Sequence, residues 1–391
     1  MPKLRLLTPG PTPLSEPVKK ALSLDMIHHR KQAFQEIFRQ VQKDLQYLFG
    51  TQQPVLILTC SGTGAMEASV LNLFNPGEKV VVINGGKFGQ RWKEIAQSRE
   101  LDVVEVKLEW GKTVQLEQLS SILDQNQVQG VLVQASETST GVLHPIEEIA
   151  ALCKQKNVLC VVDGISAVGI SPCPMDKWGI DCLLTGSQKG LGLPPGLGFV
   201  ALSQKAWDKV AQVKARGFYF DLLREKQKQA QAQTAYTPAI NLIVGLAESL
   251  KYFREKGLAK IYQKQRALTE LVRTGLTQIG LELLAKTHYT WGLTSVILPV
   301  GIDGNKLLAI LAEKYGYLIA GGQDHLKGKI VRIGHMGYVD YVDLSGCLFG
   351  LRQALLECGW ANKSRHFLEN AMEVYWKIMA KEEDLWEKKT K

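Results

Sequence analysis

The chain has 391 residues, of which 45% are hydrophobic and 22% are charged. This composition is typical of a globular protein and excludes the disordered, collagen-like and low-complexity classes. The net charge is +9, but acidic residues interrupt the basic ones along the whole chain, so we expect no nucleic-acid partner.

The same sequence argues against a membrane, disulfide or metal protein. Apolar runs stay far below the roughly 18 residues that a membrane span needs, and the N-terminus carries no hydrophobic signal core before a cleavage site. We therefore expect a cytoplasmic protein. The seven cysteines show no C-x-x-C spacing and no His-rich motif is present, so neither a disulfide framework nor a metal site is expected.

From about residue 54 to residue 203, short β-rich runs alternate with helix-length patterns. The expected strands are 54–59, 79–83, 102–107, 130–134, 158–163, 181–185 and 198–202. The expected helices between them are 64–74, 88–99 and 145–156. Several strands are nearly all apolar, as strands covered on both faces are. The alternation predicts an α/β fold with a mainly parallel seven-stranded sheet.

The remainder predicts a smaller α+β domain. Its expected helices are 238–254, 261–280, 305–314 and 340–358, and its expected strands are 293–299 and 329–333. We predict an N-terminal segment over 1–20, a large domain over 21–255, a small domain over 256–360 and a C-terminal extension over 361–391. Apolar residues at helical spacing make the extension an amphipathic helix.

Three features of the large domain point to one kind of chemistry. The first is Ser61-Gly62-Thr63-Gly64-Ala65-Met66-Glu67, which follows an apolar strand and opens a helix. Small residues there let backbone N–H groups approach an anion, which predicts a phosphate cradle, although a tight turn of this composition needs no ligand. The lysine of a Walker loop and the third glycine of a Rossmann fingerprint are both missing, so a nucleotide is not expected.

The second and third features are Asp163 and Lys189, each at the end of an expected strand. Asp163 stands where α/β sheets place ligand contacts, although a structural cap is an alternative. Lys189 follows 26 residues later and is either a solvated loop residue or an imine-forming amine. Pyridoxal phosphate needs a phosphate cradle, an amine for its aldehyde and a carboxylate beside its pyridine nitrogen. The three features together match that cofactor.

With these motifs the sequence resembles the class V aminotransferases, which are fold-type-I pyridoxal-phosphate enzymes, and within them the alanine–glyoxylate and serine–pyruvate aminotransferase group. The resemblance extends from about Leu6 to Cys358. The matching segments are Leu7-Thr8-Pro9-Gly10-Pro11, 61–67, Asn84-Gly85-Gly86-Lys87-Phe88-Gly89-Gln90-Arg91, Glu137-Thr138-Ser139-Thr140-Gly141, Val162-Asp163, Gly186-Ser187-Gln188-Lys189, Tyr236-Thr237-Pro238 and Val331-Arg332-Ile333-Gly334.

The resemblance implies a role for each matched position. Lys189 would hold the aldehyde of the cofactor and then move a proton between substrate and cofactor, while Asp163 would pair with the pyridinium. Phe88 would stack on the ring, where close relatives often carry Trp. The other expected contacts are Thr63, Gly64, Ala65 and Gln188 on the phosphate, Tyr236 and Thr237 on the phosphate from the other subunit of a homodimer, Arg332 with Ser139 on the substrate carboxylate, and Gly10 beside the substrate. The resemblance also implies that Ser139 contacts the cofactor and that the 1–20 segment, which contains Gly10, borders the active site.

The implied reaction moves an amino group from alanine or serine to glyoxylate or pyruvate in two half-reactions with ping-pong kinetics. No clear second arginine is present for a distal carboxylate, which disfavours aspartate and glutamate as donors, but phosphoserine and aspartate transaminases remain alternatives. A cysteine desulfurase-like lyase is disfavoured because the 321–328 loop has no cysteine. A non-catalytic homologue that serves as a subunit of a larger complex is the last alternative.

Overall fold

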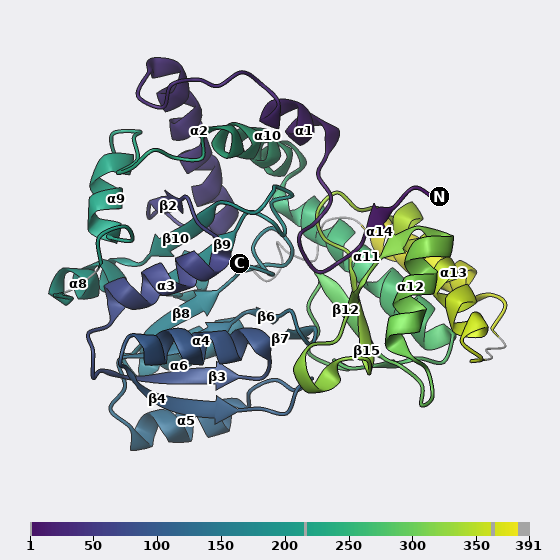
Figure 1. Cartoon of the computed structure of the whole chain (residues 1–391). Helices are drawn as coiled ribbons and strands as arrows, with labels where there is room; N and C mark the ends of the chain where they lie inside the picture. Colours follow the sequence, from purple (N-terminus) through teal and green to yellow (C-terminus); the bar gives the residue numbers. More distant parts are fainter. Residues whose placement is uncertain (1, 215–216, 361–363, 382–391) are drawn as a thin grey trace.

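The computed structural model describes residues 2–214, 217–360 and 364–381. A large α/β domain and a smaller domain lie side by side (Figure 1). The large domain contains a seven-stranded sheet in the order β2 (Val55–Leu58), β10 (Gly198–Leu202), β9 (Cys182–Gly186), β8 (Leu159–Asp163), β5 (Gly130–Gln134), β3 (Lys79–Asn84) and β4 (Asp102–Lys107). Strand β10 is antiparallel to both neighbours and the other neighbouring pairs are parallel. The predicted mainly parallel seven-stranded sheet is therefore confirmed.

Helices cover both faces of this sheet because alternate residues of a strand point to opposite sides. Val55 and Ile57 of β2 belong to one hydrophobic core with α2 and α10, whereas Leu56 and Leu58 belong to another with α3 and α4. The helices of the large domain are α1 (Glu16–Leu22), α2 (Gln32–Phe49), α3 (Gly62–Leu73), α4 (Lys87–Ser98), α5 (Leu116–Gln125), α6 (Ile146–Gln155), α7 (Met175–Trp178), α8 (Gln204–Gln212), α9 (Leu222–Gln229) and α10 (Ile240–Lys256). A short hairpin of β6 (Ser136–Glu137) and β7 (Val142–Leu143) follows β5.

The small domain has its own sheet and its own core. Its antiparallel sheet has the order β11 (Glu282–Leu283), β12 (Leu293–Ile297), β15 (Ile330–Gly334) and β14 (Ala320–Gly321). The helical elements are α11 (Leu258–Gln278), α12 (Gly304–Tyr315), the 3-10 turn η1 (Asp324–Leu326), α13 (Tyr341–Glu357) and α14 (Phe367–Met379). Gly257 separates α10 from α11, and buried residues from Ala267 onward form the second core.

The N-terminal segment joins the two domains in a way that the sequence analysis missed. Strand β1 (Arg5–Leu6) pairs in parallel with β13 (Tyr317–Leu318), and Leu7 is buried in the core of the small domain. The chain then passes between the domains toward α1 (Figure 1). Residues 5–7 are therefore part of the small domain.

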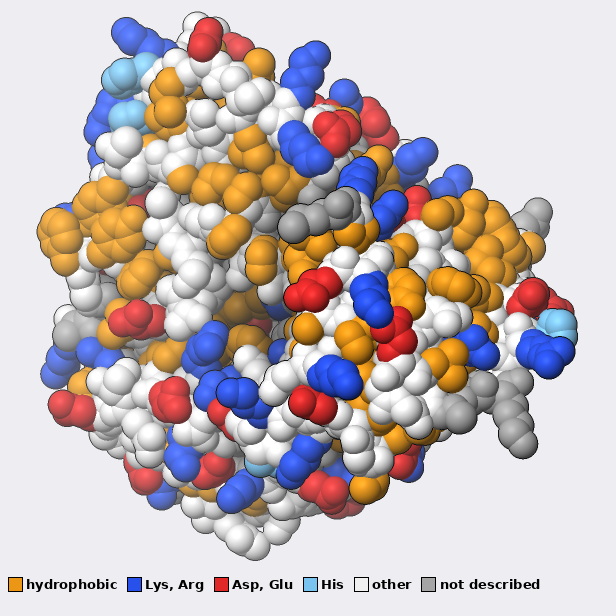
Figure 2. Space-filling view, turned by 45° about the vertical axis from the view of Figure 1, so that its right-hand side comes forward, with side chains coloured by type: hydrophobic (Ala, Val, Ile, Leu, Met, Phe, Trp, Pro, Cys, Tyr) orange, Lys and Arg blue, Asp and Glu red, His pale blue; other side chains and the backbone are white. Residues whose placement is uncertain are grey.

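Helix α14 packs its apolar side against the small domain, with Phe367, Ala371 and Tyr375 buried. Residues 361–363 and 382–391 of the expected C-terminal extension lie outside the described residues. Within the described ranges, no helix combines the length and the apolar character that crossing a membrane requires. On the face drawn in Figure 2, basic and acidic side chains alternate over the surface and form no patch of one sign.

Candidate active site

The expected site residues gather where the parallel strands of the large domain end. Strands β2, β3, β5, β8 and β9 share one direction, so their carboxyl ends meet at one edge of the sheet. Helix α3 follows β2 at this edge, α4 follows β3, and the 137–139 turn follows β5. Asp163 is the last residue of β8, and Lys189 lies three residues beyond the end of β9.

Lys189 is buried beneath the N-terminal segment. Its Nζ donates a hydrogen bond to the carbonyl of Pro9, and Thr12 Oγ1 donates to the Lys189 carbonyl at 3.0 Å. Gly10 crosses the lysine so closely that a Cβ atom there would lie 2.6–2.7 Å from Cδ, Cε and Nζ of Lys189, and its φ of +132° also favours glycine. Burial, helped by the charge of Arg332, lowers the pKa of Lys189 to about 8.

Asp163 is a buried carboxylate without a cationic partner in contact. Its Oδ1 accepts a hydrogen bond from the backbone N–H of Ile165 at 2.8 Å, and its exposed fraction is 4%. No basic nitrogen of the described residues lies within 4.0 Å of its oxygens. Burial raises the pKa of Asp163 to about 7, and the charge of Glu137 adds to this rise. A buried charge needs compensation, so the site suits a cation such as a pyridinium.

The first turn of α3 offers free N–H groups at Gly62 and at Thr63, of which Thr63 was expected and Gly62 was not, whereas the N–H groups of the expected Gly64 and Ala65 have acceptors within the chain. The Ser61 side chain accepts from the Gly64 N–H at 3.4 Å, and the Ser61 carbonyl accepts from the Ala65 N–H at 3.2 Å. Among the described residues, the N–H groups of Gly62 and Thr63 have no such acceptor. Gln188 Oε1 is buried and lacks a hydrogen-bond partner. A phosphate would satisfy amides at this helix N-terminus.

Phe88 lies in the first turn of α4 and is held by a residue that the sequence analysis did not select. Arg91, one turn further along α4, donates from Nη1 to Thr63 Oγ1 at 3.1 Å. Its guanidinium carbon lies 4.8 Å from the centre of the Phe88 ring. Arg91 therefore connects the candidate ring-stacking residue to the candidate phosphate cradle. Arg91 lies in one of the segments that match the family, but nothing in the neighbouring sequence marks it as a site residue.

Arg332 projects from β15 and is almost fully buried. It donates from Nε to the Gly321 carbonyl at 2.9 Å and from Nη1 to the Thr138 carbonyl at 3.0 Å. No carboxylate of the described residues lies within 4.0 Å of it. Burial lowers the pKa of Arg332, and the charge of Glu137 opposes this effect. A guanidinium has five N–H donors, so this one retains capacity for a substrate carboxylate.

Ser139 is engaged by the protein rather than directed to Arg332. Its hydroxyl donates to Glu137 Oε1 at 2.5 Å and accepts from the Lys87 N–H at 3.0 Å. The neighbour of Ser139, Thr138, contacts Arg332 through its carbonyl and is hydrogen-bonded through Oγ1 to Ser166 Oγ at 2.7 Å. Glu137 and Thr138 stood in a matching segment, but the sequence analysis assigned neither a role.

Tyr236 and Thr237 form a separate cluster in the single chain. Tyr236 Oη donates to the Phe218 carbonyl at 2.8 Å, and the Tyr236 ring stacks on Tyr219 with the ring centres 5.1 Å apart. Thr237 is exposed, and a small cleft beside the end of β2 is lined by both residues. Within the described part of the chain, neither makes a hydrogen bond to Lys189. Their expected role concerns a partner subunit.

The residues at this edge fit pyridoxal phosphate in their donor and acceptor chemistry. N–H groups without an acceptor lie at the first turn of α3, a buried amine of lowered pKa is available, and the buried carboxylate of Asp163 has no basic nitrogen within 4.0 Å among the described residues. The described residues contain no group of three His, Cys, Asp or Glu side chains able to hold a metal ion. The arrangement therefore suits an organic cofactor held by an amine, an anion site and a carboxylate.

Comparison with known proteins agrees with this chemistry. The aminotransferase class-V family model matches residues 18–339. The chain is 35% identical to a protein named soluble hydrogenase, small subunit, from Synechococcus sp. over 92% of this chain and 95% of the relative. It is 32% identical to a serine–glyoxylate aminotransferase of Methylorubrum extorquens over 90% of this chain and 91% of the relative.

A solved structure of an aspartate aminotransferase of subgroup IV from Thermus thermophilus superposes with a TM-score of 0.85 and 36% identity, covering 90% of this chain and 99% of that one. The family match spans most of the chain, and the relatives align over nearly their full length. The chain therefore belongs to the class V aminotransferases, and its cofactor is pyridoxal phosphate.

Proposed function

We propose that this chain is an aminotransferase that moves an amino group from alanine or serine to glyoxylate or pyruvate. The observation that carries the proposal is the meeting of three buried groups, Lys189, Asp163 and Arg332, at one edge of the sheet. Two half-reactions would run on one site, which gives ping-pong kinetics. A lysine whose pKa is lowered by burial costs stability, and so does a buried guanidinium with no carboxylate within 4.0 Å among the described residues. Their joint presence argues against a non-catalytic subunit.

Each of the three groups has a task in this scheme. Pyridoxal phosphate supplies, when bound, an aldehyde that links to amino groups and a ring that accepts electrons. Arg332 binds and orients the substrate α-carboxylate with a planar pair of N–H donors. Lys189 Nζ takes a proton from the α-carbon of the donor and passes it to the cofactor. In the second half-reaction the same amine moves a proton in the opposite direction. Asp163 keeps the pyridine nitrogen protonated, because the buried carboxylate stabilises an adjacent cation.

A small amino acid is favoured as the amino donor, because two cationic side chains near Phe88 already contact groups of the protein. Lys87 Nζ forms an ion pair with Asp324 Oδ1 at 3.3 Å, and Arg91 is held by Thr63 and the Phe88 ring. A donor with a distal carboxylate would have to displace one of these contacts. The aspartate enzyme among the similar structures makes aspartate the main alternative donor.

We also propose a cytoplasmic homodimer with shared active sites. Phe218 and Tyr219 are 72% and 45% exposed and adjoin Tyr236, which makes an exposed aromatic cluster beside Thr237. Exposed aromatic clusters mark interaction surfaces. In the dimer, Tyr236 and Thr237 of one chain would reach the phosphate held by the other chain.

A donor and acceptor matrix tests the proposed reaction. The purified holoenzyme is assayed with alanine, serine, aspartate, glutamate, phosphoserine and cysteine, each against glyoxylate, pyruvate and 2-oxoglutarate. We expect the highest kcat/KM with alanine or serine and glyoxylate or pyruvate, and parallel lines in double-reciprocal plots. Preference for aspartate or phosphoserine would overturn the donor assignment, and sulfide release from cysteine would replace transamination by a lyase reaction.

The rate of pyridoxal phosphate uptake by the apoprotein is expected to rise with pH, with a midpoint near 8. Only the neutral amine attacks the aldehyde, and burial lowers the pKa of Lys189 to about 8. An ordinary lysine would give a midpoint of about 10.4. Stopped-flow absorbance across pH 6–11 measures the midpoint, with Lys87→Gln as the control. A midpoint above about 10 would contradict the buried amine.

Replacing Arg332 with lysine is expected to lower kcat/KM for alanine about ten- to hundredfold, mainly through KM. Lysine keeps the charge but loses the planar fork, and a hydrogen bond to a charged group is worth about 1.5–3 kcal/mol. Steady-state kinetics measure the effect. The control is Arg254→Lys, which changes a half-exposed arginine paired with Asp44. Unchanged KM in the Arg332 variant would remove this residue from the substrate site.

A further inference from the structure

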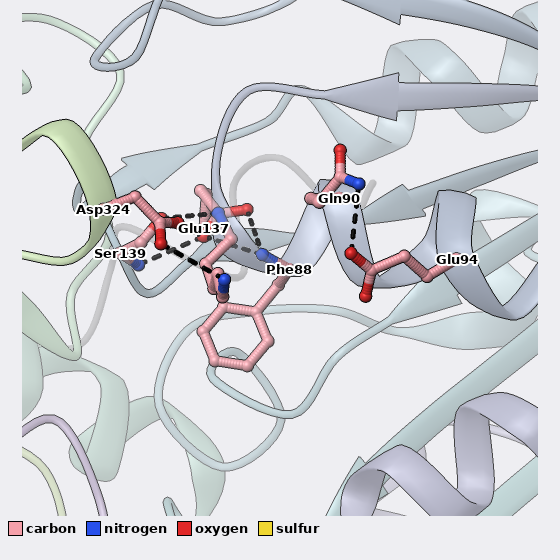
Figure 3. A network of polar contacts seen from close by, with 7 residues as sticks. Phe88, Gln90, Glu94, Glu137, Ser139 and Asp324 are labelled. Carbon is pink, nitrogen blue, oxygen red and sulfur yellow. Dashed lines mark hydrogen bonds and ion pairs between the residues drawn. The ribbon is translucent and has the colours of Figure 1, made fainter.

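A second carboxylate, Glu137, is completely buried beside the candidate active site. It follows β5 at the same edge of the sheet as Asp163. Its Oε2 accepts from the N–H groups of Phe88 and Gly89 at 3.1 Å each, and its Oε1 accepts from the Ser139 N–H at 3.1 Å and the Ser139 hydroxyl at 2.5 Å. Gln134 Nε2 donates a further bond at 3.1 Å. Figure 3 shows this carboxylate against the first turn of α4, with the Phe88 ring extending away from it.

The set of partners favours the anionic form of Glu137. The backbone N–H groups of Phe88, Gly89 and Ser139 can only donate, and between them they contact both carboxylate oxygens. The Ser139 hydroxyl adds a further donated bond to Oε1. Burial raises the pKa of Glu137, and the hydrogen bonds from Ser139, Gly89 and Phe88 oppose the rise. Charge-assisted bonds of this kind are the strong ones.

The chain leaves room for this arrangement at Gly86. A Cβ atom on Gly86 would lie 2.4 Å from Glu137 Cδ and 2.4 Å from Ser139 Oγ. The φ of Gly86 is 171°, an extended value that any residue adopts. Space for the Glu137 side chain, and not backbone conformation, is therefore the reason for glycine at this position.

Glu137 also links the groups that hold cofactor and substrate. Through the α4 amides it fixes the backbone of Phe88, and through Ser139 it fixes the turn whose Thr138 carbonyl accepts from Arg332. The charges that face it include Lys189, Arg332 and the carboxylate of Asp163. Because Arg332 has no carboxylate within 4.0 Å among the described residues, Glu137 supplies compensating charge from a distance.

We propose that Glu137 is a positioning residue of the active site, whose negative charge holds Phe88 in place and supports the Arg332 cation. The inference rests on the roles proposed above for these two residues. Glutamine at position 137 keeps the volume but removes the charge, and in either orientation its NH₂ group faces N–H donors. The substitution therefore disturbs both the first turn of α4 and the turn that carries Thr138.

The test compares Glu137→Gln with Glu94→Gln, which makes the same change at an exposed carboxylate of α4 bonded to Gln90. We expect Glu137→Gln to weaken pyridoxal phosphate binding and raise KM for the amino donor by about tenfold or more each. We expect it to alter the visible circular dichroism of the bound cofactor. Loss of a negative charge near Lys189 also moves the midpoint of cofactor uptake to lower pH. Glu94→Gln should leave all four quantities unchanged.

Glu137→Asp keeps the charge on a shorter side chain, so it should restore the uptake midpoint while leaving the dichroism altered. It also keeps the proposal testable if Glu137→Gln does not fold. Two results would overturn the proposal. The first is a Glu137→Gln protein that has a lowered melting temperature but matches the Glu94→Gln control in cofactor affinity, dichroism, uptake midpoint and KM. The second is a Glu137→Asp protein whose uptake midpoint is shifted as in Glu137→Gln. Failure of the wild type to transaminate alanine or serine would overturn the proposed reaction instead, because cofactor binding is measured without any donor.

Discussion

Replacing Lys189 with alanine is expected to lower kcat for every donor by at least about a thousandfold. Proton transfer by a positioned group contributes about 10²–10⁴-fold, and the same amine would also hold the cofactor. The amine is buried under Gly10, where its lowered pKa of about 8 keeps part of it neutral. Steady-state assays measure the loss, and borohydride reduction followed by mass spectrometry locates the attached cofactor.

The control for this variant is Lys87→Ala, which removes a nearby lysine whose Nζ pairs with Asp324. That ion pair is partly exposed, so its loss should change stability by less than about 1 kcal/mol. A Lys189→Ala enzyme that retains a tenth of the wild-type rate would assign the chemistry to another amine.

Replacing Asp163 with asparagine is expected to reduce kcat/KM by about two to three and a half orders of magnitude. Breaking a buried charge pair by removing one partner costs about 3–5 kcal/mol. Asparagine preserves the shape and can still accept from the Ile165 N–H, so the fold should persist. Kinetics and the absorption of the bound cofactor together measure the loss of ring protonation.

The matched control is Asp181→Asn, at a buried aspartate near the start of β9 that accepts from the Cys160 N–H and the Ser203 hydroxyl. This change should lower stability without altering the cofactor spectrum, because Asp181 precedes its strand, away from the carboxyl-terminal edge. An Asp163→Asn enzyme with wild-type rate and spectrum would show that another group faces the pyridine nitrogen.

Local patterns predicted the sheet well, because most of its strands, such as β5, β8 and β9, are buried along their whole length. The strand expected at 102–107 has the bounds of β4, and the one expected at 79–83 is a single residue shorter than β3. Helix α3 starts two residues before the expected 64, because Ser61 caps it from outside. The two-residue strands β1 and β13 were missed, since Arg5 pairs with Tyr317 and such short segments carry no periodicity of their own.

Site residues whose own side-chain chemistry suggests a role could be predicted from the sequence. Residues whose role depends on their contacts in the folded chain could not. Asp163 and Lys189 stood out because the first ends an apolar strand and the second lies just beyond another. Arg91, Thr138 and Glu137 did not, because their roles depend on partners far away in the chain, such as the Thr138 carbonyl bound by Arg332 194 residues later.

The most direct test of the account is the visible absorption of the purified holoenzyme before and after each substrate. We expect that L-alanine or L-serine alone bleaches the band of the bound cofactor, that glyoxylate or pyruvate restores it, and that Lys189→Ala shows neither change. A wild-type protein that binds pyridoxal phosphate but shows no change with any amino acid would contradict the aminotransferase assignment. It would favour the alternative of a non-catalytic subunit.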